Sequence, residues 1–356
     1  MAVDTMKAVR FHGRNDLRFE HIPEPTCGKD QIKVSKEANL HEYLGGPGIC
    51  PTTPHPITKE TIPLTFGHEF SGTIEEIGSD IKGDFKVGDR VAVQPIIYDG
   101  TCGACKEGLP NCCYNNGFVG LSGWGGGLSE HLVVPEYCVI KIPDNVSLEI
   151  AALVEPLSVG WHAVKISPFK PNDYVLILGG GPIGLSVIQA LRARGSNCTI
   201  IVSEVSAKRK DYAKQFGADH VLDPTVDDVV ARCREIADGV GVHEVFDCAG
   251  VQAGLDAAIH AVRARGTVVN IAVWEKACSI HPNDVMFKER KYLGVATYVL
   301  GDFKEVIDAI SEGRMKPEAM ITKRIELEEV VEEGFKALVK DKDNQVKILV
   351  KAWGGN

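Results

Sequence analysis

The pattern of apolar and polar positions changes along the chain near residue 170. Before that point, short runs that alternate apolar and polar residues are separated by stretches rich in Gly and Pro, and the runs are KAVRF, IKV, GTIEEIG, RVAVQPI and HLVVP. Alternation over a few residues is typical of half-buried strands joined by loops. The first part of the chain is therefore predicted to be a strand-dominated, loop-rich domain.

After residue 170 the apolar runs become continuous and alternate with segments of helical length. The runs are VLILG, TIIVSE, HVLD, HEVFDCAG and GTVVNIAV, and the helical segments include 206–218 and 251–266. Strands that alternate with helices predict crossover units and a parallel sheet. The apolar stretch 174–191 is long enough to suggest a membrane span, but three consecutive glycines and a proline interrupt it. It is better interpreted as a buried strand, a turn and a helix.

Beyond residue 300 an amphipathic segment, 327–341, is followed by a last apolar run, 346–352. We expect both to pack back on the first domain. The chain has 356 residues, which exceeds one ordinary hydrophobic core and favours more than one domain.

Charge and cysteine content exclude several classes of protein. The net charge of −9 argues against a nucleic-acid partner, which requires a concentrated basic face. The first residues are charged where a signal peptide would be apolar, so a cytoplasmic protein without a membrane segment is expected. In a reducing compartment, the 11 cysteines are predicted to be metal ligands and core thiols rather than disulfides.

A glycine-rich turn follows the strand VLIL and opens a helix. Gly179, Gly181 and Gly184 have the Gly-x-Gly-x-x-Gly spacing, with Ile183 in the same turn. Gly179 allows a tight turn, Gly181 allows the backbone to approach a pyrophosphate, and Gly184 allows close packing of helix on strand. The free N–H groups of the helix N-terminus then bind phosphate. This arrangement predicts a dinucleotide site in a Rossmann-type domain.

Glu204 ends the second strand of this domain, 20 residues after Gly184. A carboxylate at that position accepts the ribose hydroxyls and repels a 2′-phosphate, so NAD is predicted in preference to NADP. Lys208 and Arg209 follow and would suit a phosphate. Because Glu204 holds the discriminating position, we expect them to flank the adenine or to lie in solvent, and Arg209 is kept among the candidate cofactor-binding residues.

Two groups of residues could hold metal. In the first, Cys102, Cys105 and Cys113 have the spacing C-x2-C-x7-C, with Asp99 three residues upstream as a fourth ligand. Such a set suits a closed, structural zinc site, although a loop of inert buried thiols is the alternative.

The second group combines the histidine and glutamate of GHE, His68 and Glu69, with Glu155 in ALVEPLSVGWHAV. An imidazole and a carboxylate are suitable ligands for an open, catalytic zinc. Taken singly, a satisfied core histidine and a glutamate at a helix start are the simpler interpretations.

Together these features resemble the zinc-dependent medium-chain dehydrogenase/reductase family, in its butanediol and sorbitol dehydrogenase branch. The resemblance rests on LHEYLGGP, PLTFGHEFSG, GFVGLSGWGGGLSEH, ALVEPLSVGWHAV and NIAVW. It implies an α/β fold in which a GroES-like, strand-rich catalytic domain carries a Rossmann doubly wound parallel sheet. The implied domains are 1–155 for the catalytic domain, 156–300 for the NAD-binding domain, and 301–356 for a segment returning to the catalytic domain.

The resemblance also implies roles for individual residues. The catalytic zinc would fall on His68 and Glu155, with Glu69 as an alternative ligand, and His41 would pass the proton to solvent. The family's structural-zinc loop usually has four cysteines, and here Asp99 replaces the first. NAD and zinc are the implied cofactors, a small diol or polyol is the implied substrate, and a homo-oligomer, dimer or tetramer, is the implied assembly.

The chain departs from the family just before LHEY, where it reads QIKVSKEAN and is several residues shorter. Lys36 stands where the family has a zinc-binding cysteine, Ala38 where it has a substrate-contacting hydroxyl, and Asn39 where it has an aspartate. An ammonium at Lys36 would repel a cation unless it turned away or lost its proton. Cys50 is the one nearby candidate to replace the missing ligand, and an incidental loop cysteine is the simpler interpretation.

The polar run SKEAN is also predicted to be a poor continuation of the buried strand begun by QIKV. Two histories fit so local a loss: a recent inactivating change, or a wrongly placed splice junction. Sequencing the transcript across the codons for residues 30–45 would separate them.

Three functions remain open at this point. The leading hypothesis is an NAD-dependent alcohol or polyol dehydrogenase acting on a small vicinal diol or hydroxyketone. The alternative from another class is a catalytically silent NAD(H)-binding protein or oligomer partner on the same scaffold. A zinc-free quinone or enoyl reductase is a third, which Glu204 opposes because such enzymes usually favour NADPH.

Overall fold

A computed structural model of the protein describes residues 4–40, 50–341 and 343–351, with the backbone alone at 37–40. It divides into two compact units, each considered by itself. The first comprises Met1–Glu155, Val299–Ile307 and Pro317–Asn356, and the second comprises Pro156–Tyr298 and Asp308–Lys316. Helices α3 (Val154–Ile166) and α9 (Leu300–Ser311) have residues in both.

The second unit is built on a six-stranded sheet, as counted in the described residues, whose strands all pair in parallel. The order is β13-β12-β11-β14-β15-β16. The bounds are β11 (Tyr174–Leu178), β12 (Thr199–Ser203), β13 (His220–Leu222), β14 (Val242–Asp247), β15 (Val262–Asn270) and β16 (Lys291–Gly294). The predicted parallel sheet is confirmed.

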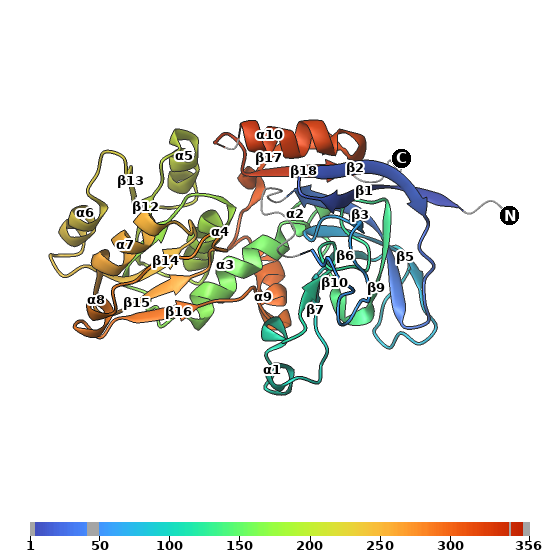
Figure 1. Ribbon diagram of the computed structural model, residues 1–356, viewed down its shortest axis with the longest axis horizontal. Helices are drawn as coiled ribbons and strands as arrows, with labels where there is room; N and C mark the ends of the chain where they lie inside the picture. Colours follow the sequence, from blue (N-terminus) through green and yellow to red (C-terminus); the bar gives the residue numbers. More distant parts are fainter. Residues whose placement is uncertain (1–3, 41–49, 342, 352–356) are drawn as a thin grey trace. The chain divides into compact units, whose positions relative to one another are not determined.

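Helices lie around this sheet, as Figure 1 shows. They are α4 (Pro182–Ala193), α5 (Ala207–Gln215), α6 (Val229–Ile236), α7 (Gln252–Ala261) and α8 (Pro282–Met286). Because helices cover a parallel sheet on its faces, the central strand β11 (YVLIL) is apolar along its length rather than alternating. The stretch 174–191 forms β11, a turn and α4, as predicted. Within the described part of the chain, every helix is too short or too polar to span a lipid bilayer.

The first unit consists mainly of antiparallel strands. A three-stranded sheet among the described residues has the order β2-β1-β4, formed by β1 (Thr5–Gly13), β2 (Asp16–Pro23) and β4 (Leu64–Thr65). Strand β1 buries residues on both faces, Met6 and Ala8 on one and Val9 and Phe11 on the other. Strands β7 (Ile96–Ile97) and β8 (Gly117–Phe118) pair with each other.

A larger sheet supports the residues that could hold the catalytic metal. Its order is β10-β6-β5-β3-β18-β17, with β9 paired to β3. The bounds are β3 (Gln31–Leu40), β5 (Phe70–Ile77), β6 (Arg90–Val93), β9 (His131–Pro135), β10 (Val139–Lys141), β17 (Ile321–Glu326) and β18 (Lys347–Lys351). The short helix α2 (Leu148–Ala151) packs on β5 and β6.

The expectation that SKEAN would be a poor strand is wrong. Strand β3 continues through Leu40, with Lys36 opposite Gly72 on β5 and residues 37–40 opposite β18. Gly72 is required there, since a Cβ on it would lie 1.7 Å from the carbonyl oxygen of Ser35. The strand persists because backbone pairing on both edges is available to any sequence, polar or apolar.

The segment after residue 316 contributes to the core of the first unit. The amphipathic stretch forms a turn at Leu327–Glu329, a π-helix at Val330–Phe335 and α10 (Lys336–Lys340). Val330 and Phe335 are buried in the same apolar cluster as Val34, Phe70 and Ile348. Strand β18 then inserts between β3 and β17. Lys347, the first residue of β18, therefore lies in the sheet that also contains β5.

Candidate active site and metal centres

Three of the predicted catalytic-zinc residues converge in the first unit. Donor atoms of His68, Glu69 and Glu155 all lie within 4.8 Å of one another. His68 and Glu69 directly precede β5, and Glu155 lies in the first turn of α3, where the helix dipole favours an acidic side chain. Glu69 and Glu155 are buried. The structure thus brings together residues that are 87 positions apart.

The electrostatics of this cluster favour a neutral imidazole. Burial lowers the pKa of His68, the carboxylate of Glu69 opposes that effect, and the nearby ammonium of Lys347 adds to it. The neutral imidazole is the form that binds metal. His68 is therefore prepared as a ligand near neutral pH.

Glu69 is held by a buried ion pair that the sequence did not predict. Nζ of Lys347, on β18, lies 2.6 and 2.5 Å from the two carboxylate oxygens of Glu69, and both side chains are 1% exposed. A lysine 278 residues away leaves no local signal in the sequence. The ammonium uses one acceptor position on each oxygen, and its positive charge weakens the attraction of Glu69 for a metal cation.

The side chain of Lys36 lies in the core of the first unit. Its ammonium was expected to repel a metal cation unless it turned away or lost its proton. Its Nζ donates to the carbonyl oxygen of Gly126 at 2.6 Å and to Oγ of Ser129 at 2.8 Å. It also lies 5.8 Å from the ring centre of Phe70. Burial holds the pKa of Lys36 well below its usual range, with Glu24 opposing. The ammonium is thus engaged by neutral acceptors rather than directed at His68.

The other residues of the departing segment add no ligand among the described side chains. Ala38 and Asn39 pair through their backbone with Val350 and Leu349. Cys50 packs in the apolar core, where burial raises the pKa of its thiol to about 11, as for an inert cysteine. Among the described residues, Cys50 belongs to neither group of possible metal ligands, that of His68 or that of Cys102. His41, the predicted proton relay, lies outside the described residues.

The cysteine loop also assembles as predicted from its spacing. Donor atoms of Asp99, Cys102, Cys105 and Cys113 lie within 4.8 Å of one another, around the short helix α1 (Gly103–Lys106). Backbone N–H groups of Asp99 and Asn115 each lie 3.4 Å from Sγ of Cys113. Such contacts hold the sulfur of Cys113 in place beside the other donor atoms. The adjacent Cys112 is exposed and is not in the group.

The carboxylate of Asp99 also accepts hydrogen bonds from within this loop. Its Oδ1 accepts hydrogen bonds from the N–H groups of Thr101 at 2.7 Å and Cys102 at 2.8 Å, and its Oδ2 accepts one from Asn115 at 2.7 Å. These bonds, that from Cys102 foremost, lower the pKa of Asp99. A carboxylate has about four acceptor positions, so Oδ2 retains one for a metal ion.

In the second unit the glycine turn has the conformation that the motif requires. Gly179 adopts a φ of +92°, and a Cβ on Gly184 would lie 1.9 Å from the carbonyl oxygen of Gly179. Gly181 is the N-cap of α4, Pro182 is its first residue, and the first turn contains Ile183 and no acidic residue. The helix N-terminus is therefore open to an anion.

Glu204 lies against this turn. Its Oε2 accepts the N–H of Gly180 at 2.6 Å and its Oε1 accepts that of Ser206 at 2.8 Å. The guanidinium of Arg209 approaches the turn, since a Cβ on Gly181 would lie 3.6 Å from its Nη1. Lys208 is exposed and lies over the ring of Tyr212. Glu204 and Arg209 thus border the predicted ribose position, whereas Lys208 does not.

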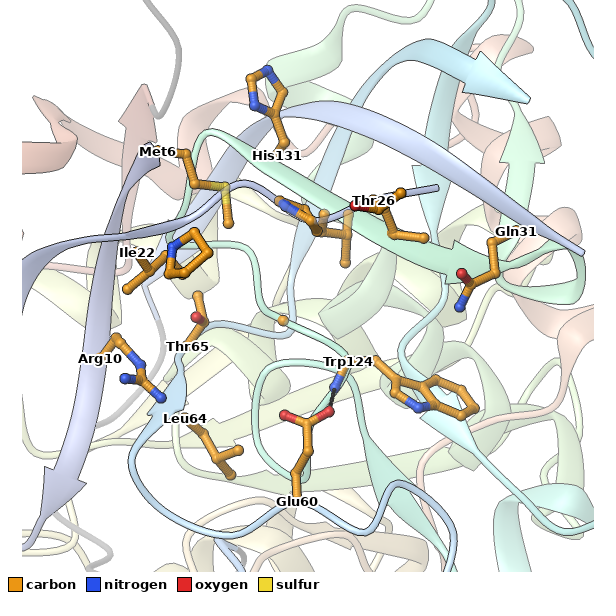
Figure 2. Close-up of a pocket in the computed structure, with 15 residues that line it drawn as sticks. Met6, Arg10, Ile22, Thr26, Gln31, Glu60, Leu64, Thr65, Trp124 and His131 are labelled. Atoms are coloured by element: carbon orange, nitrogen blue, oxygen red, sulfur yellow. Dashed lines mark hydrogen bonds between the residues drawn. The ribbon is translucent and has the colours of Figure 1, made fainter. Parts of the chain in front are cut away.

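A pocket of about 400 Å³ opens elsewhere in the first unit, between β1, β9 and the loop that carries Trp124. Figure 2 shows Arg10, Glu60 and Trp124 on its walls, with the carboxylate of Glu60 accepting the backbone N–H of Trp124 at 2.8 Å. None of the predicted ligands lines it. The group formed by His68, Glu69 and Glu155, rather than this pocket, is the candidate active site.

Comparisons with known proteins show the family to which the chain belongs. Residues 182–312 match the family described as zinc-binding dehydrogenase, and residues 44–144 match the alcohol dehydrogenase GroES-like domain. The (R,R)-butanediol dehydrogenase of Bacillus subtilis is 43% identical over 354 residues, which cover 97% of this chain and 99% of that protein.

Solved structures give the same result. The crystal structure of 2R,3R-butanediol dehydrogenase from Bacillus subtilis aligns with a TM-score of 0.90 at 42% identity, covering 97% of this chain and 99% of that chain. A protein of Sinorhizobium meliloti described as a zinc-binding dehydrogenase, bound to NADP, aligns with a TM-score of 0.83 at 30% identity, covering 98% and 99%. The predicted GroES-like and Rossmann fold class is confirmed. The chain is therefore a dehydrogenase of the zinc-binding, medium-chain alcohol dehydrogenase family.

Proposed function

We propose that this dehydrogenase oxidises a small vicinal diol or polyol, of the butanediol and acetoin kind, with NAD as the hydride acceptor and zinc as the metal. The reaction converts the diol and NAD⁺ into a hydroxyketone, NADH and a proton. The observation that carries the proposal is the convergence of His68, Glu69 and Glu155 in a chain that aligns along almost its whole length with butanediol dehydrogenases.

The donor set of the cluster fits a divalent cation. Nitrogen and carboxylate oxygen are ligands that catalytic zinc uses, and such sites have three protein ligands and one open position. His68 and Glu155 would hold the ion. Glu69 would complete the set in place of the missing cysteine by exchanging the ammonium of Lys347 for the metal.

When bound, zinc supplies a Lewis acid that polarises the substrate oxygen. The residues of the chain provide the remaining functions. Burial keeps the imidazole of His68 neutral, and the buried carboxylates of Glu69 and Glu155 supply the negative charge that a cation requires. Glu204 and the turn at Gly179–Gly184 would bind the ribose and phosphates of NAD. His41 is the proposed route for the proton to solvent.

The proposal is tested by following NADH formation with a panel of vicinal diols and polyols, with and without added zinc. Turnover is expected with at least one diol, and His68→Gln should abolish it. Ser71→Ala, which changes a buried serine of the same unit that bonds to Leu148 instead, should retain it. A zinc-loaded preparation that turns over no member of the panel would contradict the assignment.

A catalytically silent NAD(H)-binding protein is the second candidate, favoured by Lys36 at the position of a ligand and by the engagement of Glu69 with Lys347. If the protein is silent in this way, it should bind NADH normally and hold less than one zinc per chain at His68, Glu69 and Glu155. Metal analysis of the wild-type protein against His68→Gln distinguishes the two candidates, because the dehydrogenase should lose one zinc on that change and the silent protein none.

We predict that Glu204 determines the choice of NAD over NADP. Glu204→Ala should weaken NADH binding by roughly 10- to 100-fold, since a hydrogen bond to a charged group contributes about 1.5–3 kcal/mol. The same change should bring NADPH binding closer to that of NADH. Fluorescence titration with both nucleotides measures this, with the exposed Lys208→Met as the unaffected control. Tighter binding of NADPH than NADH by the wild-type protein would refute the prediction.

We predict that Asp99 is a ligand of a structural zinc as well as the acceptor of two backbone N–H groups in the turn before α1. Asp99→Ala and the control Asp228→Ala each remove a carboxylate that accepts a backbone N–H group in or just before a helix. Both should lower the unfolding free energy, because those N–H groups lose their acceptor. Zinc content after dialysis against a chelator should fall in Asp99→Ala alone. Equal zinc retention in the two variants would show that Asp99 supports the turn and binds no zinc.

We further propose a cytoplasmic homo-oligomer, dimer or tetramer. All 11 cysteines are described and free, which suits a reducing compartment. Strand β16 ends the order of the sheet in the second unit, and Met286 and Phe287 shortly before it are exposed. An apolar, unpaired strand edge is a surface that a second chain can cover. Light scattering should give at least twice the chain mass of 38.6 kDa, and a monomer would contradict this.

A further inference from the structure

Lys36 occupies an unusual position for a lysine. It lies on β3 with 2% of its surface exposed, and it is among the largest fully enclosed side chains of the described residues. Burial of an amine is costly unless its hydrogen bonds are satisfied. Here the Nζ of Lys36 donates to the carbonyl oxygen of Gly126 and to the hydroxyl of Ser129, at 2.6 and 2.8 Å. Both acceptors belong to one turn, Gly126–Ser129.

This turn is bonded directly to the backbone that precedes His68. The N–H of Gly127 donates to the carbonyl oxygen of Gly67 at 2.7 Å, and the N–H of Leu128 donates to that of Phe66 at 2.8 Å. The N–H of Val9 on β1 donates to the carbonyl oxygen of Leu128 at 2.8 Å, so the turn is clamped from a second side.

Close packing leaves the backbone before His68 little freedom to move independently of the turn. A Cβ on Gly126 would lie 2.5 Å from the carbonyl oxygen of Thr65 and 2.6 Å from that of Phe66. Gly67 has a φ of +98°, a conformation that L-residues rarely adopt, and a Cβ there would lie 3.0 Å from the side chain of Leu128. A shift of the turn would therefore be transmitted to Gly67 and to the following imidazole.

We propose that Lys36, at the position where the family has a metal-binding cysteine, is a positioning residue for His68, acting through the Gly126–Ser129 turn. In its link to metal binding this inference rests on the proposed function. Lys36 fixes the turn to β3, the turn fixes Gly67, and Gly67 orients the ligand that follows it. Partners that orient a metal ligand typically change metal affinity 10- to 100-fold when they are removed.

The first test uses Lys36→Met, which keeps the length of the side chain and removes its donors. Ser129→Ala is the second variant, since it removes one acceptor of Lys36, together with the contacts of the same hydroxyl to the carbonyl oxygens of Gly126 and His131, without changing Lys36 itself. Ser71→Ala is the matched control, because its buried hydroxyl on β5 donates to Leu148 and not to the turn. Zinc affinity is measured by competition with a chelator, counting only the zinc that His68→Gln loses. Lys36→Met and Ser129→Ala should bind zinc about 10- to 100-fold more weakly, and Ser71→Ala should match the wild type.

The second readout needs no metal. In metal-free protein labelled with ¹³C-histidine, the ring resonances of His68, identified with His68→Gln, should move in Lys36→Met and in Ser129→Ala. Those of His243 in the second unit should not move. A structural role alone would lower the unfolding midpoint in urea without moving the His68 resonances. Unchanged His68 resonances and zinc affinity in a folded Lys36→Met protein would overturn the proposal.

The two readouts separate this inference from the proposed function. A wild-type protein with no zinc dependent on His68 would defeat the metal assignment, whereas the resonances of the metal-free protein would still decide whether Lys36 positions His68. If Lys36→Met fails to fold, Ser129→Ala carries the same comparison. Stationary His68 resonances in Ser129→Ala would then overturn the proposal.

Discussion

Replacing Lys347 by methionine is expected to lower the unfolding free energy of the protein by about 3–5 kcal/mol, because it leaves the carboxylate of Glu69 buried without its ammonium. Both side chains are 1% exposed and the ammonium contacts both carboxylate oxygens. Taking a charge out of water is costly, and in this pair each charge offsets the cost of the other. Urea unfolding of the two proteins at the same pH measures the difference.

The double variant Glu69→Gln with Lys347→Met should recover most of that loss, since it removes both charges together. The exposed pair Lys7–Glu328, at 2.6 Å with side chains 43% and 46% exposed, is the control. Lys7→Met should leave the unfolding free energy close to that of the wild type, because solvent screens this exposed pair. A cost of similar size for Lys7→Met and Lys347→Met would show that burial of the Glu69 pair has no special effect.

The same variant tests whether Glu69 can serve as the third metal ligand. In the wild-type protein the ammonium of Lys347 opposes the binding of a cation to Glu69, and in Lys347→Met this opposition is absent. Added zinc should therefore stabilise Lys347→Met more than the wild type, because a ligand that binds only the folded state raises its stability. Equal stabilisation of the two proteins would place Glu69 outside the ligand set.

The features that the sequence predicted well are those fixed by neighbouring residues. VLIL followed by Gly179, Gly181 and Gly184 specifies a buried strand, a positive φ and an open helix N-terminus within about ten residues, and all three are present. The cysteine spacing around α1 is equally local, and Asp99 joins it through its contacts with the following N–H groups. Local hydrogen bonding and steric limits decide such segments largely independently of the rest of the fold.

Contacts between distant segments were predicted only where the family resemblance supplied them. The proximity of His68 and Glu155 came from that resemblance, because nothing in either segment specifies the other. The pair formed by Glu69 and Lys347 was missed, since a lysine in VKILV is indistinguishable from one at a solvated strand edge. Burial of Lys36 was missed for the same reason: its acceptors, Gly126 and Ser129, lie about 90 residues away.

The stability of the protein relative to Lys36→Met is expected to rise with pH. Burial lowers the pKa of Lys36 in the folded state well below 10.5, the value of an exposed lysine, whereas the unfolded chain keeps that ordinary value. Below the folded-state pKa both states carry the proton, and the cost of the buried charge is constant. Between the two pKa values the unfolded chain holds one more proton than the folded chain, so each increase in pH favours folding.

The slope in that window is at most about 1.4 kcal/mol per pH unit. Urea unfolding of the wild type and Lys36→Met in steps from about pH 6 to 9.5 measures it as a difference, so other titrating groups cancel as long as they behave alike in both proteins. Lys86→Met, at an exposed lysine of the same unit, should show no pH-dependent difference from the wild type. If the wild type and Lys36→Met remain parallel across this range, Lys36 titrates as an ordinary lysine, and the fold accommodates a full buried charge through Gly126, Ser129 and Phe70 alone.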